Sequence, residues 1–100
     1  MLENATAFSG FSTDDLAAAK AFYGGTLGLD ASENAMGILE VTFAHGGRVI
    51  IYPKTDHVPA TFTVLNFEVD DIDTAVDALA AAGVEVLRYE GAHQDGKGIS

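Results

Sequence analysis

Hydrophobic and polar residues follow two patterns along the chain, one typical of strands and one typical of helices. The segment 61–69 is rich in β-branched and aromatic residues, which predicts a strand. After it, apolar residues recur at helical spacing, namely Ile72, Val76, Leu79 and Ala80. They predict a helix over 70–82, capped by Asp70 or Asp71 and ended at Gly83, because carboxylates bind the free amides of a first turn.

The first half of the chain shows the same order of patterns. A strand-like run at 5–12 leads into a predicted helix at 14–24, which ends at Gly24-Gly25. The buried face of that helix would be Leu16, Ala19, Phe22 and Tyr23. Three short strands are then predicted at 27–31, 37–43 and 48–52. A hairpin turn joins the last two at 44–47, where paired glycines accept positive φ. Pro53 ends the third strand, and 54–60 is predicted to be a linker.

The two halves share a short motif. Phe11-Ser12-Thr13-Asp14-Asp15-Leu16 aligns with Phe67-Glu68-Val69-Asp70-Asp71-Ile72 at an offset of 56 residues. We therefore predict an α+β fold in which residues 1–100 form a single domain of paired modules. The first is βαβββ over 5–54, and the second covers 61–100. The second is predicted to be incomplete, because only one further strand, 84–89, precedes a polar loop at 91–100. A truncated chain, a longer chain or a covering partner would each explain this.

Composition narrows the range of partners. The chain carries 5 basic and 15 acidic residues, a net charge of −10. Nucleic acid and anionic membranes are therefore not expected as partners, since both require a positive surface. The longest uncharged stretch, 57–67, is shorter than the roughly 20 apolar residues of a membrane span. No secretory signal is visible, so a cytoplasmic protein is the expectation. The chain has no cysteine, which excludes disulfides and cysteine-based zinc sites.

The repeated motif resembles a known family. The first copy runs from Asp14-Asp15-Leu16 through Ala21-Phe22-Tyr23 to Leu27-Gly28-Leu29, and the second continues into Ala81-Ala82-Gly83-Val84. Both are similar to the vicinal oxygen chelate superfamily of glyoxalases, bleomycin-resistance proteins and extradiol dioxygenases. The resemblance implies two half-cups of strands that face each other around a small-molecule cavity. It also implies, for the enzymes, a divalent metal held by His, Gln or Glu of the first and last strands.

The positions that the resemblance assigns to metal ligands carry no donor atoms here. They fall on Phe8, Val49 and Val64, and the fourth would lie on the missing last strand. A shift by one residue gives Ser9, Ile50 or Leu65, which is no better. Divalent metals require N, O or S donors, so no metal cofactor is predicted. A second conceivable ligand set is His57, Asp56, Glu90 and His93, but its spacing matches no compact metal motif.

Strand parity predicts which side chains line the cup. The expected ligand-binding residues are Phe8, Ser12, Val49, Ile51, Phe62, Val64 and Asn66, with Gly10 beside them. The opposite parity would place Phe11, Leu65, Phe67 and Val69 beneath the helices. Two alternatives stay open. The cup could be filled by its own side chains, and Asn66 could bond the backbone instead of a ligand.

Three functions follow as hypotheses. The first is a metal-free protein that binds a small apolar or aromatic molecule in its cup, and the acidic balance suits a cationic one. The second is a metal-dependent lyase, isomerase or dioxygenase of the same superfamily. The third is a non-catalytic remnant that pairs with another chain. No catalytic residue is identified, and a homodimer is predicted because an incomplete module leaves strand edges unpaired.

Overall fold

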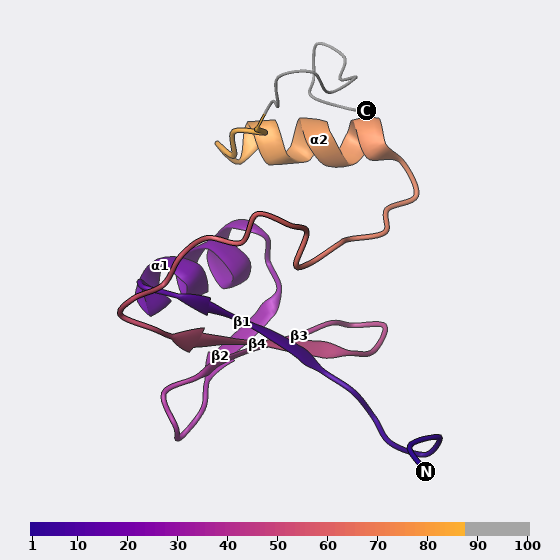
Figure 1. Ribbon diagram of the computed structural model, residues 1–100. Coiled ribbons are helices and arrows are strands. Elements are labelled where there is room, and N and C mark those ends of the chain that lie inside the picture. Colours follow the sequence, from indigo (N-terminus) through magenta and orange to yellow (C-terminus); the bar gives the residue numbers. More distant parts are fainter. Residues whose placement is uncertain (88–100) are drawn as a thin grey trace. The chain divides into compact units, whose positions relative to one another are not determined.

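A computed structural model of the chain describes residues 1–87 (Figure 1). The chain divides into two compact units, Met1–Val64 and Leu65–Ser100, and each is described by itself. The fold is α+β. The first unit has the predicted βαβββ order, with a mixed four-stranded sheet.

The sheet has the strand order β1-β4-β3-β2. Its strands are β1 (Ser9–Thr13), β2 (Asp30–Glu33), β3 (Leu39–Thr42) and β4 (Arg48–Pro53). β1 pairs in parallel with β4, while β2, β3 and β4 form antiparallel neighbours. The predicted hairpin between β3 and β4 is confirmed. Gly46 and Gly47 adopt positive φ angles of 104° and 87°, which side chains disfavour.

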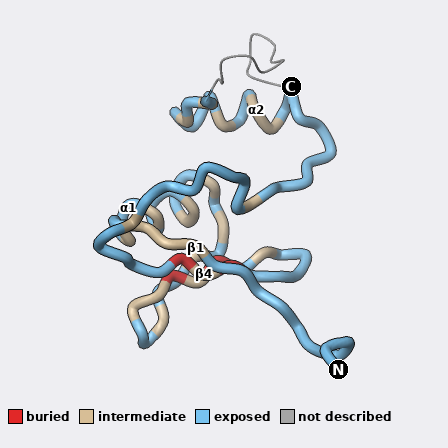
Figure 2. The backbone as a smooth tube through the Cα atoms, in the orientation of Figure 1, coloured by how far each residue is buried: buried red, intermediate tan, exposed pale blue. Residues whose placement is uncertain are grey.

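The buried residues of the first unit lie on the two central strands, β3 and β4 (Figure 2). Leu39, Val41 and Ile51 are fully buried, and Val49 is 4% exposed. The register pairs Leu39 with Ile51 and Val41 with Val49, so all four side chains share one face of the sheet. Their alternation with exposed neighbours is what a half-buried sheet requires.

The helical segment of the first unit has two parts, α1 (Leu16–Lys20) and the π-helical η1 (Ala21–Thr26). α1 begins because Asp15 accepts a hydrogen bond from the amide of Ala18 at 2.9 Å. The predicted end at Gly24-Gly25 is wrong, since the helix continues through both glycines. It ends at Thr26, and Gly28, with a φ of 71°, turns the chain just beyond it. The amides of Leu27 and Leu29 still bond η1 carbonyls, so β2 begins later than the predicted residue 27.

The second unit contains the helix α2 (Ile72–Ala81). The Asp71 carboxylate accepts hydrogen bonds from the amides of Asp73 and Thr74, at 3.0 and 3.2 Å. Gly83, with a φ of 85°, follows the helix, and the amide of Val84 bonds the carbonyl of Leu79. The predicted helix, its aspartate cap and its glycine stop are therefore confirmed.

The strand predicted over 61–69 is absent, because these residues form no ladder in the described part of the chain. A β-branched, aromatic sequence favours a strand only where a neighbouring strand and a packed face exist. Val84 to Leu87 has no regular structure either, and the rest of the predicted strand 84–89 and the loop 91–100 lie outside the described residues.

Candidate functional site

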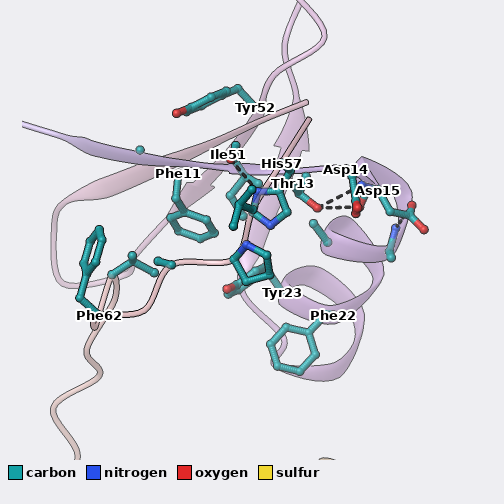
Figure 3. A pocket seen from close by; sticks show the side chains of 18 residues that line it. Phe11, Thr13, Asp14, Asp15, Phe22, Tyr23, Ile51, Tyr52, His57 and Phe62 are labelled. Atoms are coloured by element: carbon teal, nitrogen blue, oxygen red, sulfur yellow. Dashed lines mark hydrogen bonds between the residues drawn. The ribbon is translucent and has the colours of Figure 1, made fainter. Parts of the chain in front are cut away.

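The first unit contains a cavity of about 710 Å³ beside the edge strand β1 (Figure 3). Three stretches of chain form its walls: β1 with the helical segment α1 and η1 that follows it, the end of β4, and the coil 57–64. Ala18 and Ala19 of α1 contribute only methyl groups to the wall, which leaves room beside the helix. The volume is in the range of small-molecule sites, about 300–1,000 Å³.

Five aromatic rings line the cavity, those of Phe11, Phe22, Tyr23, Tyr52 and Phe62. Phe11 and Tyr23 lie with ring centroids 6.2 Å apart, and Phe22 meets Tyr23 edge-to-face at 5.1 Å. Phe22 and Tyr23 are consecutive residues of the π-helical turn η1, and both line the cavity. Phe62 is 74% exposed and Phe22 is 37% exposed, so both retain ring surface that a guest could cover.

A single side-chain hydrogen bond joins the coil 57–64 to the sheet. Ser12 Oγ lies 2.7 Å from His57 Nδ1, across 45 residues of sequence. Both residues are partly buried and both line the cavity. They form a polar contact between two walls of the cavity, and they combine a hydroxyl with an imidazole.

The charged groups of the cavity are acidic. Asp14 and Asp15 line it, while no Lys or Arg is among its lining residues, all of which the structure describes. Asp15 is engaged as the cap of α1. The Asp14 carboxylate has no hydrogen-bond or ion-pair partner within residues 1–87. The field of these carboxylates favours a neutral or cationic guest over an anionic one.

Burial raises the pKa of the Tyr23 phenol above its ordinary value of 10.0. The hydroxyl is therefore protonated at neutral pH, so Tyr23 contributes a neutral ring and an O–H group to the cavity.

Strand parity predicts one shared sheet face for Gly10, Ser12, Val49 and Ile51, and the register corrects this. Register pairs Ser9 with Val49 and Phe11 with Ile51, so Val49 and Ile51 lie on the face opposite to Gly10 and Ser12. The prediction treated residues of β1 and β4 independently, whereas residues paired across a ladder share a face. The partners of Gly10 and Ser12 are Ile50 and Tyr52.

The structure brings four of the predicted ligand-binding residues to the cavity, which are Ser12, Ile51, Phe62 and Val64. It does not bring Phe8 or Val49 there. Asn66 belongs to the second unit and is exposed. Without a strand over 61–69, nothing directs alternate residues of that segment to one face. Ligand roles for Phe8, Val49 and Asn66 stay predictions.

Sequence reasoning missed Phe11, Phe22, Tyr23 and His57 as cavity residues. The first three were assigned to the core beneath the helix, and His57 to a surface linker. The sequence signal for the first three is a cluster of aromatic residues close to Asp14-Asp15. Such a cluster is equally typical of core packing, and only the course of residues 57–64 shows that these rings line a cavity.

The positions that the family resemblance assigns to metal ligands do not fit a metal ion. At Phe8, the guanidinium of Arg48 lies 4.2 Å from the ring centroid and bonds Glu40 at 2.6 Å. A fixed cation there opposes a second cation. Val49 is buried on the other face. Within residues 1–87, no three His, Asp or Glu side chains form a group able to hold a metal. Glu90 and His93 lie outside the described residues.

Comparison with known proteins settles the family. The model of the Glyoxalase/Bleomycin resistance protein/Dioxygenase superfamily matches residues 6–100. The chain belongs to this superfamily. The resemblance seen in the repeated Asp-Asp motif is thereby confirmed, as is the α+β fold.

Two solved structures share the fold of this superfamily member. One comes from the mobile metagenome of V. pseudocholerae, with 19% identity, a TM-score of 0.62, and coverage of 98% of this chain and 82% of that chain. The other is an integron cassette protein from the mobile metagenome of V. cholerae, with 15% identity, a TM-score of 0.57, and coverage of 98% and 84%. At these identities the likeness concerns the fold.

No curated protein matches the chain. Among the described residues, no helix has the length and apolar character needed to cross a bilayer.

Proposed function

We propose that this superfamily member is a metal-independent binding protein that holds a small aromatic molecule in the cavity of its first unit. The observation that carries the proposal is the wall of five aromatic rings around a space of about 710 Å³. Three of the rings, Phe22, Tyr52 and Phe62, are exposed in the free protein. Rings that remain accessible inside a concave site are typical of small-molecule recognition.

Donor chemistry supports binding without a metal. The phenyl and isopropyl groups at Phe8, Val49 and Val64 cannot coordinate a metal ion. In addition, the Arg48 guanidinium lies over the Phe8 ring. The cavity itself offers carboxylates, hydroxyls and one imidazole, and no metal-binding cluster of His, Asp and Glu exists within the described residues. Metal-dependent lyase, isomerase or dioxygenase chemistry therefore has no support from these positions.

The charge of the lining supports a neutral or cationic guest. Asp14 and Asp15 are the ionised groups near the start of α1, and no basic side chain balances them in the cavity. The whole chain is also strongly acidic, with a net charge of −10. An aromatic carboxylate would be repelled by the two aspartates of the cavity and by the net negative charge of the whole chain.

Amide chemical-shift mapping of the full chain, with toluene as probe, tests the proposal. We expect shifts to concentrate at residues 10–15, 22–23 and 57–64. Phe62→Ala should weaken toluene binding by roughly 5- to 10-fold, because it removes one apolar wall. Phe67→Ala, which removes an exposed ring outside the cavity, is the matched control and should leave affinity unchanged. The absence of any saturable shift, or equal losses in both variants, contradicts the proposal.

A further inference from the structure

We infer that His57 is the specificity-determining residue of this cavity, held by Ser12, and that the preferred guest is an aromatic molecule bearing a hydroxyl group, of the phenol class. The inference rests on the proposed function and names the chemistry of its guest. It starts from the only imidazole among the cavity's lining residues, which Figure 3 shows among the aromatic side chains.

The first step is the fixed position of the His57 ring. Nδ1 lies 2.7 Å from Ser12 Oγ, and the backbone amide of His57 donates to the Lys54 carbonyl at 3.1 Å. One bond therefore holds the side chain and another holds the backbone. Within the described residues, Nε2 has no hydrogen-bond partner. The second ring nitrogen is left available in a partly buried position.

The second step concerns the proton on the imidazole. If Ser12 donates its hydroxyl proton to Nδ1, then Nε2 carries the hydrogen and is a donor. If Nδ1 carries the hydrogen and donates to Ser12, then Nε2 is an acceptor. A hydroxyl group both donates and accepts, so it complements either tautomer. A carbonyl or an ether complements only the donor form.

The third step concerns the aromatic side chains that line the cavity together with the His57 imidazole. The rings of Phe11, Tyr23 and Phe62 line the same cavity as His57, so the cavity presents one guest with both an imidazole and aromatic faces. A polar group without a partner is costly in such surroundings. A hydroxyl attached directly to an aromatic ring satisfies the imidazole while its ring covers the apolar wall.

The test compares p-cresol with toluene, which differ by one hydroxyl group. We expect the full chain to bind p-cresol roughly 3- to 10-fold more tightly than toluene, the value of one net hydrogen bond. His57→Phe, which keeps a flat ring and removes both nitrogens, should abolish this preference, so that p-cresol and toluene bind the variant equally. His45→Phe, in the exposed β3–β4 turn, is the matched control and should retain the preference.

A nitrogen-15 measurement separates recognition from a merely structural bond. The Nε2 resonance of His57 should move on addition of p-cresol and stay in place with toluene. Ser12→Ala should reduce the preference by loosening the ring while leaving Nε2 present, which keeps the inference testable if His57→Phe folds poorly. Equal binding of the two probes, or an Nε2 resonance that ignores p-cresol, overturns the inference while the proposed function stands. If neither probe binds, the proposed function fails with it.

Discussion

Single side chains decide how closely the strands β1 and β4 approach each other. Gly10 pairs with Ile50, and a Cβ at Gly10 would lie 2.7 Å from Ile50 Cγ1. The Ile50 side chain therefore covers the space that any larger residue at position 10 would need. In contrast, a Cβ at Gly25 in η1 would meet nothing within 4 Å, and its φ is not positive.

Gly10→Ala should lower the free energy of unfolding by about 1–2 kcal/mol, because the overlap forces Ile50 or the strand to shift. Gly25→Ala is the matched control and should leave stability unchanged or raise it by up to about 1 kcal/mol, since alanine favours helical backbone. Urea unfolding of the two variants measures the difference. Equal stabilities would contradict the close contact between β1 and β4.

Tyr23 gives the first unit a pH dependence at the alkaline end. Because burial raises the pKa of its phenol above 10.0, the native state holds this proton more tightly than the unfolded chain does. The stabilising effect is complete below pH 10 and is lost as the pH rises through the raised pKa.

Tyr23→Phe should therefore show a shallower fall in unfolding free energy above pH 10 than the unsubstituted protein. Urea unfolding at pH 8, 9, 10 and 11 measures the two slopes. Tyr52→Phe, at the end of β4, is a control in which the steep fall should persist. Parallel curves for Tyr23→Phe and the unsubstituted protein would show that the phenol is not the responsible group.

At the scale of elements, local signals predict the fold well where one residue determines the geometry. Asp71 caps α2 through two amides, and Gly83 follows it with positive φ, as their residue types indicate. The hairpin at Gly46-Gly47 follows for the same reason. These features depend on a few neighbouring atoms, so sequence alone is sufficient for them.

Elements and sites that depend on distant partners were not predictable in this way. Residues 61–69 have strand propensity but no ladder within the described residues, and the propensity is realised only with a neighbour. The cavity exists because the coil 57–64 lies against β1, where Ser12 and His57 form a hydrogen bond. The face of Val49 depends on the register between β1 and β4, which no local pattern encodes.

Asp71→Ala should lower the stability of α2 by about 1 kcal/mol, because two first-turn amides lose their acceptor. Asp70→Ala, one residue earlier, removes the same charge without removing the cap and should have a smaller effect. Amide hydrogen exchange of residues 73–81 in the full chain is the measurement. Equal protection in both variants would count against the capping role.

At the scale of the whole molecule, the sheet of the first unit has two edges, β1 and β2. Neither edge pairs with a further strand within the described residues. Unpaired edge amides and carbonyls favour association with another strand. The acidic surface opposes this at low ionic strength, since both copies carry a net charge of −10.

We therefore predict a homodimer that is stabilised by salt. Sedimentation velocity at micromolar concentration should show the dimer fraction rising between about 10 and 300 mM NaCl, as screening shortens the range of charge repulsion. A chain that sediments as a monomer across this range, up to hundreds of micromolar, would exclude the dimer.

The central claim, aromatic binding without a metal, is tested most directly by calorimetric titration of the full chain with p-cresol before and after exhaustive EDTA treatment. We predict saturable binding with the same affinity and stoichiometry in both preparations, and no gain on adding Zn²⁺ or Mn²⁺ to the treated protein. Binding that disappears with EDTA and returns with a divalent metal would contradict the account, because Phe8, Val49 and Val64 cannot supply its ligands.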